Sequence, residues 1–131
     1  MLGYEFPVAG LASWLCLKAD AIMRRDKPKD AYDVVWLINA VGPAEAARRL
    51  ADTPLLAGDL ARDVLNQLSR LVRDQFRDLG AAGPAMYASF LGVNESDANR
   101  RQAHGTLAAL GKALDARGIH LTEADLSAGG V

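Results

Sequence analysis

The sequence has too little cysteine and too little excess charge to support several classes of function. One cysteine among 131 residues cannot form an intramolecular disulfide, and the N-terminal residues lack the charged start and apolar core of a secretory signal. No uncharged run approaches the ~20 residues that cross a bilayer. The 15 Lys and Arg balance 16 Asp and Glu, so bulk charge does not support nucleic-acid binding. These absences predict a cytoplasmic protein without a membrane partner.

β-Branched residues are scarce as well. The sequence holds 24 Ala and 19 Leu but only 11 Val and Ile together, and Ala and Leu favour helices where Val and Ile favour strands. A mass of 14.0 kDa is that of one domain. We therefore predict one all-α domain over residues 1–131, a bundle of about five to six helices. The one candidate strand is the extended segment Tyr4–Val8, which Pro7 would confine to a sheet edge.

Helical periodicity and the glycine and proline stop signals give the expected helices. They run from Gly10 to Arg25, Pro28 to Val41, Pro43 to Leu50, Leu56 to Leu79, Ala85 to Leu91 and from the cap Asn94 to about Gly118, followed by a terminal turn capped by Thr122. In the longest of these patterns the arginines and aspartates lie mainly off the apolar stripe. That arrangement is typical of a solvated face, with an RNA-facing role for the arginines as the alternative.

The segment from Lys18 to Asp33 places charged residues where the helical pattern is otherwise apolar. Lys18 has apolar neighbours on almost every side, so its ammonium must reach water, pair with an acid, or face a ligand. Asp30 and Asp33 are three residues apart and continue the apolar stripe of the next helix. Because a short turn joins the two helices, we expect an antiparallel hairpin in which Lys18 approaches both aspartates. From composition and spacing alone, a structural ion pair is favoured over an active site.

The same segment resembles a motif region of a known family. Ser13 to Ile38 is similar to the C-terminal motif region of nucleotidyltransferase-fold proteins of the AbiEii/AbiGii toxin family. In those proteins a helix carrying a Lys is followed by an Arg-rich turn and then by a helix that begins Lys/Arg-Asp-x-x-Asp. The matching positions are Lys18, Arg24 or Arg25, Lys29, Asp30 and Asp33. The downstream helices match only in general helical character.

The resemblance implies transfer of a nucleotide from a nucleoside triphosphate, usually onto RNA or protein, by toxins of toxin–antitoxin and phage-defence systems. It implies that Lys18 contacts the triphosphate, with Arg24, Arg25 and Lys29 as further nucleotide-binding positions. It also implies that Asp30 and Asp33 hold Lys18 or help to orient the nucleotide or acceptor, so that Lys18 and the two aspartates form the catalytic set.

The metal-binding part of the family pattern is missing from the sequence. Nucleotidyl transfer needs Mg²⁺ held by carboxylates, which the family takes from a Gly-Ser pair followed by an Asp-x-Asp strand. Neither motif occurs in this sequence, so we expect no metal site in this chain. The resulting hypothesis is a truncated or split toxin lobe that is silent by itself. Mg²⁺ and a nucleoside triphosphate are expected only when a complementary N-terminal lobe completes the site.

Two other hypotheses stay open. The first is a helical protein–protein interaction module, because loss of a lobe should uncover Trp14, Tyr32 or Trp36 for a second copy or an antitoxin-like partner. The second is a decayed toxin remnant without present activity. Cys16, His104 and His120 are interpreted as core, surface or interhelix residues, since none has a partner at catalytic or metal-ligand spacing.

Overall fold

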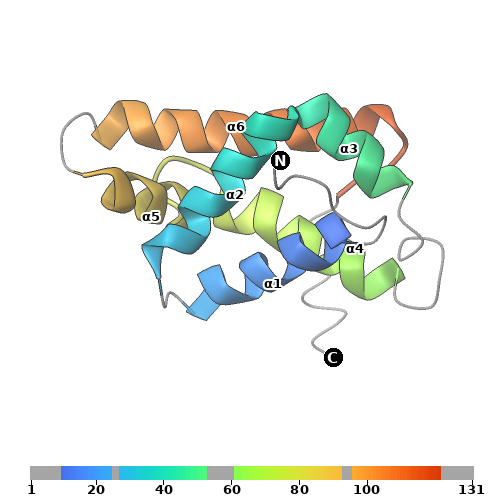
Figure 1. Cartoon of the computed structure of the whole chain (residues 1–131), viewed down its shortest axis with the longest axis horizontal. Helices are drawn as coiled ribbons and strands as arrows, with labels where there is room; N and C mark the ends of the chain where they lie inside the picture. Colours follow the sequence, from blue (N-terminus) through green and yellow to red (C-terminus); the bar gives the residue numbers. More distant parts are fainter. Residues whose placement is uncertain (1–9, 25–26, 53–60, 93–95, 122–131) are drawn as a thin grey trace.

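The computed structural model describes residues 10–24, 27–52, 61–92 and 96–121. In those ranges the chain is helical, without a strand, which confirms the all-α prediction (Figure 1). The elements are α1 (Gly10–Arg24), α2 (Pro28–Val41), α3 (Pro43–Ala51), α4 (Ala61–Ser69), the π-helical segment η2 (Arg70–Gln75), α5 (Ala82–Leu91) and α6 (Ser96–Ala116). The candidate strand Tyr4–Val8, the cap Asn94 and the terminal turn at Thr122 lie outside the described residues.

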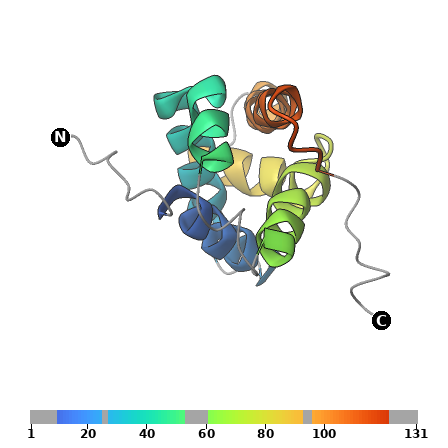
Figure 2. The ribbon, with the colours of Figure 1, turned by 90° about the vertical axis from the view of Figure 1, so that its right-hand side faces the viewer.

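The helices enclose one apolar core. α6 is the longest helix and packs against α3 and α5, while α1 packs against α2 and α4, so that α2 crosses between the two groups (Figure 1). Figure 2 shows the helices arranged around a common centre. The largest side chains in that centre are fully buried: Leu15, Ile22, Val34, Val35, Ile38, Leu50, Leu68, Leu71, Phe76, Leu107, Leu110 and Leu114.

Local sequence signals set the bounds of α2. Pro28 occupies the first turn, where its missing N–H removes no helical hydrogen bond. Gly42 ends the helix with a φ of 96°, a left-handed conformation that favours glycine, and its N–H donates to the Ile38 carbonyl at 2.7 Å. Pro43 then begins α3. Both ends of α2 therefore lie at proline and glycine signals that are present in the sequence.

The predicted continuous helix from Leu56 to Leu79 is wrong in its second half. Within the described residues, α4 passes into η2, where the Phe76 N–H donates to the Leu71 carbonyl at 3.1 Å across the wider π-helical turn. The helical segment ends at Gln75, with Phe76 as its C-cap, before Leu79. α5 packs closely at this point, since a Cβ added to Gly83 would lie 2.6 Å from the Phe76 ring and 2.7 Å from the Gln75 carbonyl oxygen.

α5 begins earlier than predicted, at Ala82 instead of Ala85. The sequence pattern assigned Pro84 to the helix break, but in the structure Pro84 lies in the first turn, where proline is tolerated. The end of α6 follows the prediction, because Gly118 adopts a φ of 85° just after Ala116. No helix among the described residues is both long enough and apolar enough to cross a membrane.

Candidate functional site

The α1–α2 hairpin brings Lys18 to both aspartates, as predicted. The Lys18 Nζ donates to Asp30 Oδ1 at 2.8 Å and to Asp33 Oδ2 at 3.0 Å. Asp30 lies in the first turn of α2 and Asp33 follows on the same face, so the start of α2 presents two carboxylates to one ammonium group of α1. The Lys–Asp contacts join α1 to the start of α2. Figure 1 shows the two helices next to each other.

Lys29 completes a group with equal numbers of positive and negative charges. Its Nζ donates to Asp33 Oδ1 at 3.0 Å and to Asp33 Oδ2 at 3.3 Å. Asp33 is thus shared between two ammonium groups, and two lysines balance two aspartates. We call these four residues, Lys18, Lys29, Asp30 and Asp33, the Lys–Asp cluster.

Most of the Lys–Asp cluster is withdrawn from water. The exposed fraction of the side chain is 19% for Lys18, 15% for Asp30 and 22% for Asp33, against 62% for Lys29. The Lys18 Nζ also lies 5.3 Å from the centre of the Trp14 ring, within cation–π range. Partial burial lowers the pKa of Lys18, but the hydrogen bonds and charges of Asp30 and Asp33 together outweigh it and leave the pKa above its usual value.

The Lys–Asp cluster does not fit a divalent cation. Both oxygens of Asp33 and one oxygen of Asp30 already accept hydrogen bonds from ammonium groups, which a metal ion would have to displace. In the part of the chain that the structure describes, no group of three or more His, Cys, Asp or Glu side chains could hold a metal. The arrangement suits an anionic ligand placed at a lysine better than a metal placed between carboxylates.

The remaining sequence-predicted residues do not join the cluster. Arg24 is exposed and pairs with Asp20, one turn earlier in α1. Arg25 lies outside the described residues. Burial raises the pKa of the Cys16 thiol to about 11, which disfavours the thiolate and agrees with its interpretation as a packing residue. His120 is exposed and pairs with Asp115.

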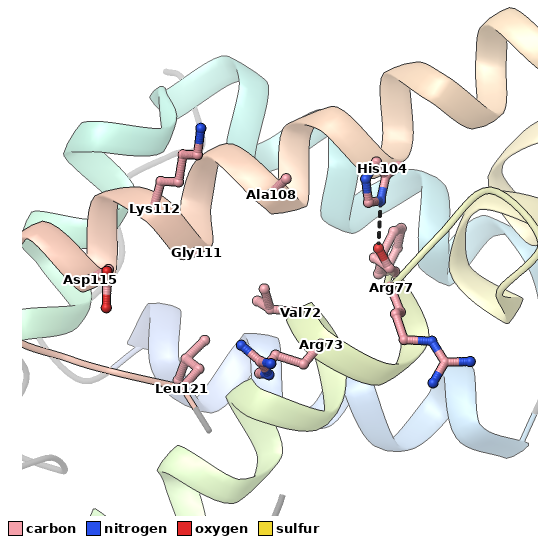
Figure 3. A pocket seen from close by; sticks show the side chains of 10 residues that line it. Val72, Arg73, Arg77, His104, Ala108, Gly111, Lys112, Asp115 and Leu121 are labelled. Carbon is pink, nitrogen blue, oxygen red and sulfur yellow. Dashed lines mark hydrogen bonds between the residues drawn. The ribbon is translucent and has the colours of Figure 1, made fainter. Parts of the chain in front are cut away.

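The structure also has a pocket that the sequence analysis missed. It has a volume of about 450 Å³ and is lined by η2 and the turn after it, by one face of α6, and by Leu121 (Figure 3). One signal could have pointed to it: α6 carries small residues at Ala108 and Gly111, beside the leucines at Leu107 and Leu110 that fill the core. No lining residue belongs to α1 or α2, so the pocket and the Lys–Asp cluster are separate features.

Comparison with known proteins decides the family. The family model described as nucleotidyl transferase AbiEii toxin, type IV toxin–antitoxin system, matches residues 1–113. The chain belongs to the AbiEii family. The match includes the whole Lys–Asp cluster and extends far beyond the Ser13–Ile38 segment that carries the resemblance in the sequence. No curated protein and no solved structure gives a significant match.

As a member of the AbiEii family, the chain is a nucleotidyltransferase-like protein of a toxin family. The toxins of this family have an antitoxin as their counterpart in a toxin–antitoxin system. The roles of Lys18, Arg24, Arg25, Lys29, Asp30 and Asp33 stay predictions.

Proposed function

We propose that the Lys–Asp cluster is the nucleotide-binding half of a nucleotidyl-transfer site. Lys18 binds the triphosphate of a nucleoside triphosphate, and Asp30 and Asp33 hold its ammonium in place. The observation that carries the proposal is the position of one lysine Nζ at 2.8 and 3.0 Å from two carboxylates, in a chain of the AbiEii family.

The geometry leaves Lys18 able to bind a phosphate oxygen. An ammonium group has three donors, and among the described residues two of them are used, by Asp30 and Asp33. The raised pKa of Lys18 keeps the group charged at neutral pH. Two fixed acceptors restrict the ammonium to one position, so less ordering is needed when a phosphate arrives. Lys29, at the exposed edge of the cluster, adds a second positive charge near the same ligand.

We place the metal ligands of the reaction outside this chain. Mg²⁺ neutralises charge on the transferring phosphate, but Asp30 and Asp33 are engaged by lysines, and the sequence holds neither Gly-Ser nor Asp-x-Asp. The chain then acts as a truncated or split toxin lobe that needs a complementary lobe, with RNA or protein as the acceptor. By itself it binds the nucleotide without transferring it.

Nucleotide binding and transfer can be measured separately. Titration calorimetry with ATP, GTP, CTP and UTP should give saturable binding of at least one of them. Lys18→Met should weaken that binding about tenfold or more. Lys27→Met is the matched control, because it removes the same charge from the exposed start of α2 without removing a side-chain cap.

Equal binding by the wild type and Lys18→Met would overturn the assignment of Lys18. The transfer assay uses radiolabelled nucleoside triphosphates, Mg²⁺ and bulk tRNA, and we expect no labelled product from the isolated chain. Robust transfer would overturn the split-lobe part of the proposal, and its loss in Lys18→Ala would still support the role of Lys18.

A second candidate function, a protein-interaction module, rests on exposed apolar side chains. Trp36 on α2 is 43% exposed, and Phe90 and Leu91 at the end of α5 are each 44% exposed. The Phe90 ring lies 4.7 Å from that of Tyr32, so α2 and α5 contribute aromatic groups to one surface. Exposed apolar patches of this kind usually find a partner, such as a second copy or an antitoxin. Light scattering that shows a strict monomer over a wide concentration range would exclude self-association.

A further inference from the structure

The pocket between η2 and α6 has more positive than negative charge. Arg73 and Arg77 approach from η2 and the turn after it, and Lys112 from α6 (Figure 3). Asp115 is the one carboxylate in the lining, and it is paired with His120. Among the described residues, Arg73 and Lys112 have no ion-pair or hydrogen-bond partner, and Arg77 has only its chain neighbour Asp78, at 3.5 Å.

The positions of these cations differ. Figure 3 shows the Arg73 guanidinium extended past Val72 toward Leu121, while the ends of Arg77 and Lys112 turn outward at the rim. All three basic residues are exposed, and their long side chains can reorient at little energetic cost. Arg73 is therefore the cation already placed in the pocket, and Arg77 and Lys112 can close over a ligand from two sides.

His104 adds a polar group whose tautomer is set by a hydrogen bond. Its Nδ1 lies 2.9 Å from the Phe76 carbonyl oxygen (Figure 3). A carbonyl oxygen only accepts, so Nδ1 carries the proton, and in the neutral ring Nε2 is left as an acceptor. That carbonyl is free for His104 because the helix ends at Phe76, where the last carbonyls have no partner within the helix.

The rest of the lining is apolar and is shaped by small residues. Val72, Phe76 and Leu121 contribute apolar surface, and Ala108 leaves room on the opposite helix. At Gly111 a Cβ would lie 3.1 Å from Val72 Cγ1, so α6 approaches η2 closely there. The volume of about 450 Å³ is that of a small-molecule site. A ligand that fits has an apolar or planar body and a negatively charged end.

The π-helical turn is a second feature that points to a ligand. π-Helical segments are rare and are found frequently at functional sites. Val72 and Arg73 within η2, and Phe76 and Arg77 directly after it, all belong to the lining of the pocket. A regular α-helix continuing to Leu79 would not end its hydrogen bonding at Phe76 and would keep the Phe76 carbonyl from His104.

We infer that this pocket binds a small phosphorylated ligand whose other end is an apolar or planar group. Arg73 and Lys112 hold the phosphate, because arginine and lysine are the preferred phosphate partners in proteins. Val72 and Leu121 contact the apolar or planar body. The site is independent of the proposed function, since no residue of the Lys–Asp cluster lines it. A polynucleotide fits less well, because the formal net charge of the chain is −1.

The test is titration calorimetry of the full chain with AMP, adenosine, inorganic phosphate and a single-stranded oligonucleotide. AMP should bind more tightly than adenosine or phosphate alone, because only AMP supplies both the anion and the planar body. Arg73→Gln and Lys112→Gln should each weaken AMP binding several-fold, and together about tenfold or more. Arg117→Gln is the control: it removes one positive charge close by, from an exposed residue that does not line the pocket.

A further variant locates the bound ligand. Ala108→Leu extends an exposed position of α6 into the pocket, and it should abolish AMP binding without changing the free energy of unfolding much. Unchanged AMP binding in Ala108→Leu, or in the double variant Arg73→Gln and Lys112→Gln, would place AMP outside this pocket and overturn the inference. So would absence of saturable AMP binding, an equal loss in Arg117→Gln, or tighter binding of the oligonucleotide than of AMP.

Discussion

The Lys–Asp cluster and the η2–α6 pocket use basic residues in opposite ways. In the cluster each carboxylate is bonded to an ammonium group, and the central side chains of Lys18, Asp30 and Asp33 are about one-fifth exposed. In the pocket the cations outnumber the carboxylates, and Arg73 and Lys112 have no partner among the described residues. The difference separates two kinds of binding group: one held in place before a ligand arrives, and one that a ligand must order.

The same difference indicates which of these side chains stabilise the fold and which are free to bind a ligand. A half-buried charged network that is fully satisfied stabilises the fold and also positions its members. Exposed and unpaired cations contribute little to stability, so they are free to serve a ligand. Stability measurements on matched variants can therefore test whether the two regions differ as the contacts indicate.

The largest effect on stability is expected from Lys18→Met. The change leaves Asp30 and Asp33 without the donor that joins α1 to α2, and hydrogen bonds to charged groups are each worth about 1.5–3 kcal/mol. We expect the free energy of unfolding, measured by urea denaturation, to fall by about 2 kcal/mol. Lys27→Met should stay within about 0.5 kcal/mol of the wild type.

A triple variant identifies the cause of that loss. Adding Asp30→Asn and Asp33→Asn to Lys18→Met removes the unpaired charge of Asp30 and the charge of Asp33, which is then paired with Lys29 alone, and part of the lost stability should return. If Lys18→Met is as stable as the wild type, the Lys–Asp cluster does not hold the hairpin. The cluster would then have no role in the fold, and the case for a ligand at Lys18 would become stronger.

Alkaline pH should also weaken the α1 region. The pKa of Cys16 is raised from 9.0 to about 11 by burial, and that of Lys18 is raised above 10.5, chiefly through Asp30 and Asp33 acting against burial. In both cases the folded state keeps a proton that the unfolded state has lost, so stability falls as pH rises. The fall begins near pH 9 with Cys16 and continues above 10.5 with Lys18.

Urea denaturation from about pH 8 to about pH 11 measures this slope. Cys16→Ser should flatten the first part of the decline, and Lys18→Met the second. Arg73→Gln should follow the wild-type profile throughout, since arginine stays protonated over this range. A steeper or flatter slope in Arg73→Gln would show that the two regions are coupled.

Sequence reasoning succeeded where the determinants are local. The break before Pro28 and the three-residue spacing of Asp30 and Asp33 are enough to predict that Lys18 approaches both aspartates. It failed where distant segments meet. The early end of the helix lies where Gly83 of α5 packs closely on Phe76, and the pocket depends on α6 packing against a π-helical turn. Helical periodicity in one segment does not contain that information.

The smallest effect on stability is expected from the double variant Arg73→Gln and Lys112→Gln. Both side chains are exposed and make no ion pair among the described residues, so their removal should change the free energy of unfolding by less than about 0.5 kcal/mol. Thermal or urea unfolding measures it. A loss above about 1 kcal/mol would show that these cations stabilise the fold. If the stability is unchanged, any loss of ligand binding in this variant comes from the missing charges and not from an altered pocket. Lys18 differs in this respect, because one substitution there is expected to change folding and binding together.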